Sequence, residues 1–508
     1  MSILTDRLRA LSPDRVRAMR RGVEKESLRT DAAGQLALTP HPAALGSALT
    51  HPRITTDFSE SQLELITGPH PKVADCLREL TEIHQVTYRA LGEELMWVAS
   101  MPCSLPADET IPIGRYGTSN VGRAKSVYRM GLGHRYGRRM QTISGIHYNW
   151  SLPGVSTEEY FALIRNFRRH AFVLLYLFGA SPAVCSSFVE GREHALQTLQ
   201  GQCLYMPHGT SLRMGRLGYQ SDAQSALAVS YNGLDEYSGS LQEALTRPYP
   251  AYQRLGVRNA GGEYNQLATS LLQIENEFYG TIRPKRTIRT GERPLHALRE
   301  RGVEYVEVRC MDLDPFEPVG IGAQTMHLLD VFLMHCLLSP SAPDTPQEIA
   351  ELSRNQHRAA ERGREPGLML ERGSRELPLV EWGAEVLEAC GPIAAHLDAA
   401  LQVSAHSEAL RAARHALLEP SATPSARVLQ AMADGHDNSW REFVLARSRQ
   451  TRQALLDAPC DEALLQRYAG LAEQSLAAQR QLEAQDQEPF ETFRQHYVSA
   501  EQLTPAPQ

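Results

Sequence analysis

The 508 residues carry a formal net charge of −7, with 42% hydrophobic and 22% charged side chains, the composition of an ordinary soluble globular protein. The negative charge gives no electrostatic reason to expect nucleic-acid binding. The longest apolar run, at 171–180, is ten residues long, whereas a membrane span needs about 20, so no membrane segment is expected. Eight scattered cysteines without a C-x-x-C pair predict reduced thiols in a cytoplasmic protein.

The first informative stretch is an acidic one at residues 21–29, with the sequence RGVEKESLR. If it forms a strand, alternation places Glu24 and Glu26 on the same face. Two neighbouring carboxylates repel each other, so a fold that brings them together needs a compensating cation. Oxygen ligands at this spacing suit Mg²⁺ or Mn²⁺, which commonly share their coordination shell with phosphate. The alternative is an exposed polar strand face.

A second acidic stretch follows at residues 55–67. Its second half alternates as a strand should and places Glu64 opposite Leu63 and Leu65, although Glu60 remains an alternative for the site-facing carboxylate. Residues 101–141 are rich in Pro, Gly, Tyr and Arg. They are expected to form a long loop that helps to build a site, without a Walker or dinucleotide-binding pattern.

The segment at 141–152 is the next predicted strand. One of its faces is wholly polar and contains His147 and Asn149. A lone histidine is often a hydrogen-bonded structural residue, but Asn149 beside it on the same face favours a ligand-facing strand.

Three of the four residues at 283–286 are cationic, namely Arg283, Lys285 and Arg286. They indicate either polyphosphate binding or a solvated basic loop.

Residues 303–309 form the clearest predicted strand. Its more apolar face should pack against the core and leave Glu307 and Arg309 adjacent on the site side. A carboxylate for a metal beside a guanidinium for a phosphate is one interpretation, and a cross-strand salt-bridge face is the other.

From about residue 325 the chain is rich in Ala, Leu, Glu, Gln and Arg with helical periodicity. We therefore expect a sheet-based core over residues 1–340 and a mainly helical C-terminal region over 341–508 that packs on it.

Taken together, these segments resemble glutamate–cysteine ligases (γ-glutamylcysteine synthetases) of the gammaproteobacterial type. Seven blocks carry the resemblance in family order: 21–29, 55–58, 116–120, 141–149, 176–182, 282–286 and 304–309. The resemblance implies an α+β fold, in which an antiparallel sheet like that of glutamine synthetase and the guanidino kinases carries the active site.

The resemblance also implies roles for individual residues. The metal set would be Glu24, Glu26, Asp57, Glu64, His147 and Glu307. The ATP-binding set would be Arg283, Lys285, Arg286 and Arg309. The amino-acid pockets would be lined by Tyr128, Leu132, Asn149, Arg213 and Tyr219. Arg309, Glu307 and His147 would be the catalytic residues.

The implied reaction is the first step of glutathione biosynthesis. ATP would phosphorylate the γ-carboxylate of L-glutamate, and the amine of L-cysteine would attack the acyl phosphate, with Mg²⁺ (Mn²⁺ possible) as the cofactor. The resemblance further implies a cytoplasmic monomer that is inhibited by glutathione. Three other classes stay open: a related carboxylate–amine ligase with a different amine, a Mg²⁺-dependent phosphohydrolase, and a non-catalytic binding protein.

Overall fold

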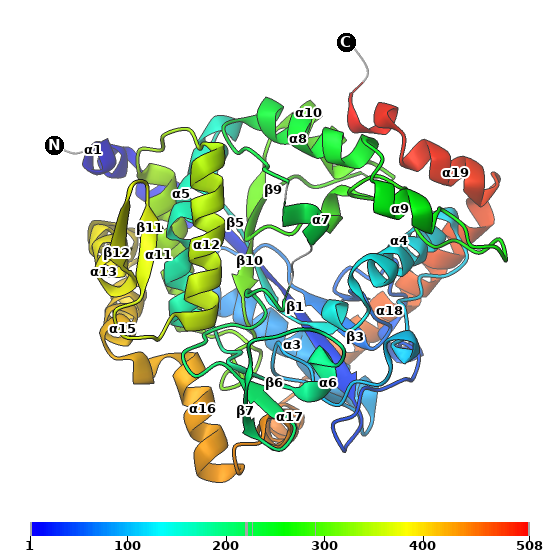
Figure 1. The fold of residues 1–508 in the computed structure, drawn as a ribbon, viewed down its shortest axis with the longest axis horizontal. Helices are drawn as coiled ribbons and strands as arrows, with labels where there is room; N and C mark the ends of the chain where they lie inside the picture. The colour runs from blue at the N-terminus through cyan, green and yellow to red at the C-terminus, as the bar shows by residue number, and fades with distance from the viewer. Residues whose placement is uncertain (1–2, 219–221, 226, 290, 506–508) are drawn as a thin grey trace.

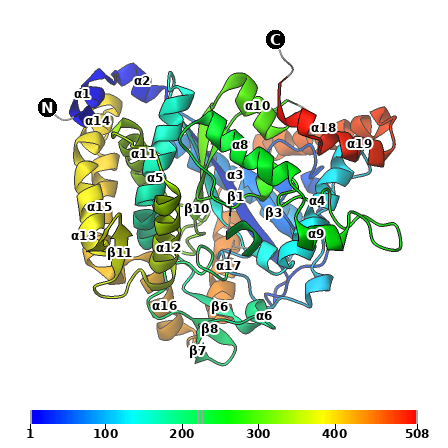
Figure 2. The same ribbon diagram turned by 45° about the horizontal axis from the view of Figure 1, so that its top comes forward.

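The computed structural model describes residues 3–218, 222–225, 227–289 and 291–505. At its centre is a seven-stranded antiparallel sheet with the strand order β2-β3-β1-β5-β10-β9, in which β4 pairs with β1 (Figures 1 and 2). The strands are β1 (Arg20–Thr30), β2 (Ile54–Thr56), β3 (Gln62–Ile66), β4 (Leu95–Met96), β5 (Ile146–Ser151), β9 (Ile282–Lys285) and β10 (Tyr305–Met311). The predicted α+β class with an antiparallel sheet is confirmed.

Three helices cover one face of this sheet, which we call the rear face. They are α3 (Val73–Leu91), α5 (Thr157–Phe178) and α11 (Ala323–Leu338). Strand alternation supplies the apolar side chains beneath them, because Val23, Tyr148 and Val308 are completely buried. The side chains that alternate with these, among them Glu24, His147 and Glu307, consequently lie on the opposite, front face.

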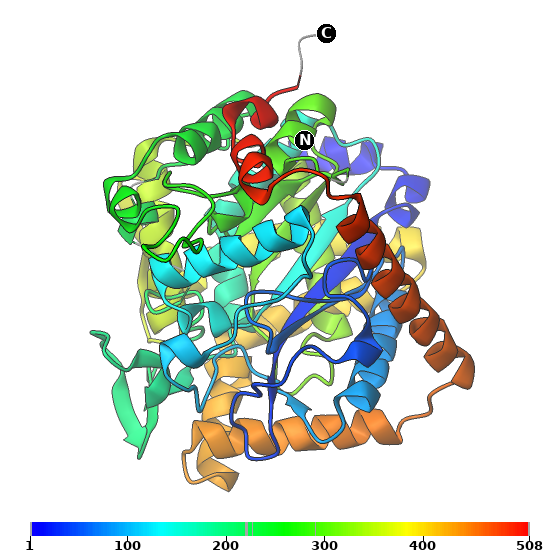
Figure 3. The same cartoon turned by 90° about the vertical axis from the view of Figure 1, so that its right-hand side faces the viewer.

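The front face is bordered by α4 (Asn120–Tyr136), which lies in front of the strands in Figure 3. The other elements before residue 340 are α1 (Ile3–Ala10), α2 (Pro13–Arg17), α6 (Ser186–Val189), α7 (Asp222–Ser225), α8 (Leu234–Thr246), α9 (Pro250–Leu255), α10 (Pro294–Arg301) and a small antiparallel sheet of β6 (Ala183–Cys185), β7 (Gln197–Gln200) and β8 (Cys203–Tyr205).

The chain after residue 340 contributes eight α-helices and one hairpin within the described residues. They are α12 (Pro346–Arg362), β11 (Met369–Arg372), β12 (Arg375–Pro378), α13 (Leu379–Ala389), α14 (Gly391–Leu401), α15 (Ala405–Leu418), α16 (Pro424–Gly435), α17 (Trp440–Asp457), α18 (Glu462–Gln485) and α19 (Phe490–Tyr497). This chain runs around the core: α15 packs on α11, α17 on α3 and α19 on α4 (Figure 1).

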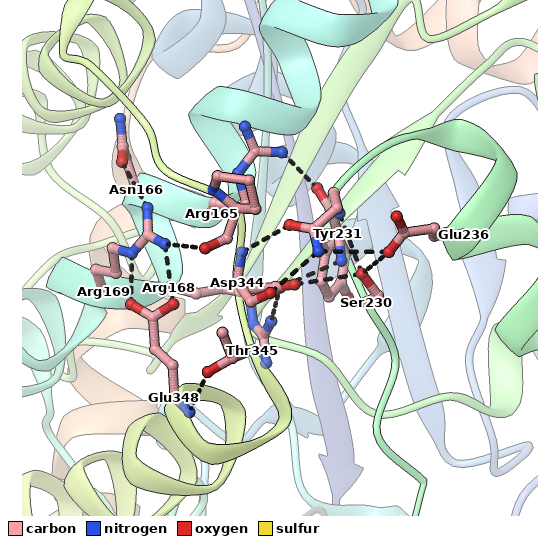
Figure 4. Close-up of polar contacts among 12 residues, drawn as sticks. Arg165, Asn166, Arg168, Arg169, Ser230, Tyr231, Glu236, Asp344, Thr345 and Glu348 are labelled. Carbon is pink, nitrogen blue, oxygen red and sulfur yellow. Dashed lines mark hydrogen bonds and ion pairs between the residues drawn. The ribbon is translucent and has the colours of Figure 1, made fainter. Parts of the chain in front are cut away.

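A cluster of arginines on α5 holds the segment that connects α11 to α12 (Figure 4). Arg165 donates to the carbonyl of Tyr231 at 2.7 Å, and Arg169 pairs with Glu348 at the start of α12 at 2.7 Å. Asp344, between α11 and α12, accepts from the backbone N–H of Tyr231 at 3.2 Å. The network ties α5 and Tyr231 to the beginning of α12.

The prediction of a long loop over residues 101–141 was wrong for its second half, where α4 begins after Ser119. The Ser119 hydroxyl caps this helix by accepting from the N–H of Gly122. The glycines that suggested a loop serve close packing instead. A Cβ at Gly122 would lie 2.2 Å from the carbonyl oxygen of Tyr116, and one at Gly131 would lie 2.2 Å from the side chain of Gln273.

The expectation of reduced thiols was wrong for one pair. Cys103 and Cys185 form a disulfide with a Cα–Cα separation of 5.1 Å and a sequence separation of 82. Two cysteines so far apart in the chain leave no spacing signal, because tertiary packing alone brings them together. The other cysteines are free.

Among the helices in the described part of the chain, none is both long and apolar enough to cross a membrane.

Candidate active site

The pairing register brings the predicted polar residues together on the front face of the sheet. Glu24 on β1 lies opposite His147 on β5, and Glu26 lies opposite Glu64 on β3. On the other side of β5, Asn149 lies opposite Glu307 of β10. Cross-strand partners in an antiparallel pair point to the same face, so the four strands present one continuous polar surface.

His147 is at the centre of this surface and is 3% exposed. Its Nδ1 lies 3.1 Å from a carboxylate oxygen of Glu24 and 3.7 Å from one of Glu307, and its Nε2 lies 3.4 Å from one of Glu26. Asn149 donates from Nδ2 to the second oxygen of Glu24 at 2.9 Å. Three carboxylates from two strands therefore converge on one imidazole.

Cations from β9 and β10 adjoin the same cluster. The carboxylate of Glu307 lies 3.3 Å from Arg309, 3.5 Å from Lys285 and 4.0 Å from Arg283. Burial alone would raise the pKa of Glu307, but Lys285 and Arg309 outweigh it and hold that pKa well below its ordinary value.

Two other carboxylates, Glu26 and Glu64, are not compensated to this extent. Burial, with a further contribution from Asp57, raises the pKa of Glu26 to about 8. Burial and the charges of Glu24 and Asp57 likewise hold the pKa of Glu64 well above its ordinary value. The front face thus carries more carboxylates than its own cations neutralise, which is the electrostatic signature of a cation-binding site.

Gly145, immediately before β5, packs tightly against the side chains of Glu26 and Arg213. The N–H of Gly145 donates to the carboxylate of Glu26 at 2.7 Å. A Cβ at Gly145 would lie 2.2 Å from the guanidinium of Arg213. That guanidinium is buried and donates to the carbonyl of Arg309 at 2.8 Å. Only glycine allows both contacts, so this position orients a site carboxylate and a site cation together.

Most of the sequence-predicted residues line a single cavity of about 390 Å³. They are Glu24, Glu26, Asp57, Glu64, Tyr128, Leu132, His147, Arg283, Lys285, Glu307 and Arg309. Between the two candidate carboxylates, Glu64 is the one in the cavity, because Glu60 instead accepts from the backbone N–H groups of His41 and Arg115.

Three predicted residues are not among those that line this cavity: Asn149, Arg213 and Arg286. Asn149 instead donates to the carboxylate of Glu24. Arg213 lines a neighbouring cavity of about 330 Å³, which Arg309 also borders. Arg286 donates to the carbonyl of Arg301 at 2.8 Å and lies 3.7 Å from Glu304, and it does not line the large cavity. Tyr219 lies outside the described residues.

The sequence reasoning missed several residues that line the same cavity. Lys125 and Arg129 belong to α4, where they share a face with Tyr128 and Leu132 at helical spacing. This signal was hidden because the segment was interpreted as a loop. Gln141 and Tyr279 also line the cavity, and the Gln141 amide donates to the Tyr279 hydroxyl at 2.8 Å.

Two aromatic residues near the C-terminus were missed as well. Phe493 and Tyr497 of α19 lie at the wall of the cavity, although the sequence gave no reason to connect this helix with a site. Their rings are stacked with centroids 5.7 Å apart.

The donor atoms of the front face fit a hard divalent cation. The cavity is lined by seven carboxylate side chains, five of which belong to the predicted metal set, and by the imidazole of His147. Donor atoms of Glu24, Glu64 and His147 lie within 4.8 Å of one another. Within the described residues, His147 Nε2 and one carboxylate oxygen of Glu307 are buried without a hydrogen bond. Buried acceptors without donors are what a cation would satisfy.

The sequence profile of the family described as "Glutamate-cysteine ligase" matches residues 8–359. A protein named glutamate–cysteine ligase from Saccharophagus degradans is 46% identical over 503 residues, 95% of each chain. A second from Janthinobacterium sp. is 46% identical over 518 residues, 98% of each chain.

Solved structures give the same result for the fold. The structure of Francisella tularensis glutamate–cysteine ligase in complex with AMP matches with a TM-score of 0.90 and 36% identity, covering 94% of this chain and 97% of that one. A bifunctional glutathione synthetase from Pasteurella multocida matches with a TM-score of 0.69 and 27% identity, covering 90% of this chain and 55% of that one.

Proposed function

The chain belongs to the glutamate–cysteine ligase family and makes γ-glutamylcysteine from glutamate and cysteine with ATP, and we propose that it does so on the front face of the sheet. The observation that carries this assignment is the convergence of Glu24, Glu26 and Glu307 on His147, with Arg309 3.3 Å from Glu307. The cluster combines acidic metal ligands and phosphate-binding cations, as ATP-dependent activation of a carboxylate requires.

The residues that would hold the cofactor are those of the front face. Glu24, Glu26, Asp57, Glu64, His147 and Glu307 offer mainly oxygen donors, which favours Mg²⁺ and also admits Mn²⁺. When bound, such an ion screens the negative charges of ATP and of the glutamate side chain from each other. Asn149 holds the carboxylate of Glu24 toward His147 and so keeps this ligand in place.

Arg309 is the residue we assign to the transferred phosphoryl group. A γ-carboxylate oxygen of glutamate attacks the γ-phosphorus of ATP, and ADP leaves. A planar guanidinium can contact two of the equatorial oxygens, across which negative charge is spread in this transfer. Lys285 and Arg283, on the neighbouring strand β9, lie on the same face and would neutralise the remaining phosphates. Arg286 would join them only if its side chain left Glu304.

In the second half of the reaction, the cysteine amine attacks the acyl phosphate. A C–N bond forms, inorganic phosphate leaves, and the amine loses its proton. Tyr128 and Leu132 of α4 would line the cysteine pocket, while Arg213 and Tyr219 would meet a substrate carboxylate. Positioning the amine next to the acyl phosphate supplies much of the acceleration in such reactions.

Further features of this proposal come from the family resemblance. We propose that the sheet is of the glutamine synthetase and guanidino kinase type. The proposed organisation is a catalytic core over residues 1–340 with a helical region over 341–508, in a cytoplasmic monomer that glutathione inhibits.

The decisive experiment measures ADP release by the purified full chain with Mg²⁺, ATP and glutamate, with and without cysteine, followed by mass analysis of the product. Cysteine-dependent release with a γ-linked dipeptide is expected. Release that depends on another amine would indicate a related ligase, and release without any amine would indicate a phosphohydrolase. A Glu24→Gln variant that turns over like the wild type would move the reaction away from the front face.

A further inference from the structure

Behind the sheet, away from the proposed active site, lies a second cluster of histidine and carboxylate side chains. It is formed by His327 and Asp330 on α11 and by His406 on α15. His327 and Asp330 are three residues apart and therefore share one face of their helix. One nitrogen of each imidazole and one oxygen of the carboxylate all lie within 4.8 Å of one another.

Two imidazole nitrogens of this cluster lack hydrogen bonds. His327 Nδ1 and His406 Nε2 are buried without a hydrogen-bond partner among the described residues. His406 Nε2 lies 3.9 Å from Asp330 Oδ2, which is too long for a hydrogen bond. Asp330 is completely buried and His406 is 1% exposed, so water does not readily satisfy these atoms. Buried polar atoms that point at one another without bonding are uncommon in folded proteins.

The ring nitrogen of His406 that points away from the cluster is hydrogen-bonded to a carboxylate, as is usual for a histidine that ligates a metal. Its Nδ1 lies 2.8 Å from Oδ1 of Asp398, which also accepts the backbone N–H of His406 at 3.0 Å. The other oxygen of Asp398 accepts the N–H of Ser407 at 2.9 Å. A carboxylate fixed in this way selects the tautomer with its proton on Nδ1 and leaves the lone pair of Nε2 facing Asp330 and His327.

The charge around Asp330 determines which ion the cluster would take. Arg21 of β1 lies 2.9 Å from Asp330 Oδ2, and the hydroxyl of Tyr148 donates to Oδ1 at 2.8 Å. Because Arg21 already shares the charge of Asp330, the two imidazoles must supply most of the affinity. Imidazole ligands favour zinc and similar transition metals, whereas Mg²⁺ requires a shell of oxygen atoms.

We propose that His327, Asp330 and His406 form a binding site for one divalent transition-metal ion of the zinc class. The ion would join α15 to α11 directly behind the strands that carry Glu24 and His147. It would be bound independently of the ion on the front face, and the inference does not depend on the reaction assigned there.

The test measures zinc content. The full-length protein is stripped with a chelator, dialysed against Zn²⁺ in the presence of excess Mg²⁺, and its bound zinc is measured by mass spectrometry. We expect about one zinc per wild-type chain, and a loss of that ion in His327→Gln and in His406→Gln, because each substitution deletes one of three protein ligands. The matched control is His147→Gln, which alters the front cluster and should retain the zinc.

His406→Gln leaves Asp398 without a partner and could unfold the chain. His327→Gln should remain folded, because His327 is only partly buried, and it therefore tests zinc binding even if His406→Gln unfolds. Zinc should raise the thermal unfolding midpoint of the wild type and not that of His327→Gln, since only a ligand of the folded state stabilises it. Wild-type protein that takes up no zinc, or a His327→Gln variant that takes up as much as the wild type, would overturn the proposal. Loss of zinc from His147→Gln alone would assign the ion to the front face.

Discussion

Two clusters of acidic and imidazole groups occupy opposite faces of the same strands. Along β1, Arg21 points to the rear and Glu24 to the front; along β5, Tyr148 points to the rear and His147 to the front. The rear carboxylate, Asp330, is paired with Arg21 and its pKa lies below its ordinary value although burial opposes ionisation. The front face instead leaves Glu26 and Glu64 without enough cations.

The charges of Arg21 and Asp330 are compensated within the fold, whereas the front-face carboxylates Glu26 and Glu64 still lack sufficient cations. Arg21 and Asp330 are both almost completely buried and joined by a direct ion pair, so removing either one leaves an uncompensated charge in the core. Front-face carboxylates border a cavity and can be neutralised from outside by protons or by a bound cation. Substitutions on the rear face should therefore change stability, and substitutions on the front face should change turnover.

The largest expected effect is that of Arg21→Met on stability. It leaves Asp330 buried without its cation and should lower the free energy of unfolding by about 3–5 kcal/mol. The kcat of the remaining folded protein should change little, because Arg21 does not line the active-site cavity. Urea unfolding measures the change. The matched control is Arg20→Met, because the Arg20 guanidinium donates to the nearby backbone carbonyls of Ala18 and Met19. Equal unfolding midpoints for the two variants would contradict the role assigned to the rear pair.

Glu24→Gln should lower kcat with little effect on stability, the opposite of Arg21→Met. It removes one charge from the front cluster at nearly constant shape. Substituting a residue that only hydrogen-bonds to a metal ligand costs up to about 100-fold. Because Glu24 is proposed to bind the metal directly, its kcat should fall by more than that. Its unfolding free energy should change much less than that of Arg21→Met. Steady-state ADP release gives kcat and urea unfolding gives the stability. Turnover close to wild type at saturating Mg²⁺ would remove Glu24 from the metal set.

Arg309→Lys tests whether the front cluster needs a planar cation or only a positive charge. We expect kcat to fall by about 10- to 100-fold, less than for full removal of a donor to a developing anion, because the ammonium keeps the charge but cannot bind two oxygens in one plane. Arg286→Lys is the comparison variant, since Arg286 pairs with Glu304 outside the cavity. Unchanged kcat in Arg309→Lys would make Arg309 structural, and an equal loss in Arg286→Lys would add Arg286 to the phosphate-binding residues.

Strand alternation explains why the front face could be predicted from sequence. His147 and Glu307 each occur in a strand whose other face is mainly apolar, and Glu24 shares its strand face with Glu26, so their direction followed from periodicity alone. The rear cluster could not be predicted in this way. Asp330 and His406 lie in helices 76 residues apart, and only tertiary packing brings them together. The Cys103–Cys185 disulfide was missed for the same reason.

The smallest effect that we predict concerns α4, whose helical character the glycines concealed. Lys125 lines the front cavity, and burial, with a contribution from Arg129, lowers its pKa to about 8. If it faces the phosphates of ATP, Lys125→Met should raise the KM for ATP by about tenfold, since a charge-assisted hydrogen bond contributes about 1.5–3 kcal/mol and the neighbouring cations compensate for part of its loss. The kcat at saturating ATP should change less. Arg123→Met on the same helix is the control, because the Arg123 guanidinium lies over the ring of Phe490 and does not line the cavity. An unchanged KM in Lys125→Met would restrict phosphate binding to the cations of β9 and β10 and leave α4 only its role in lining the cavity.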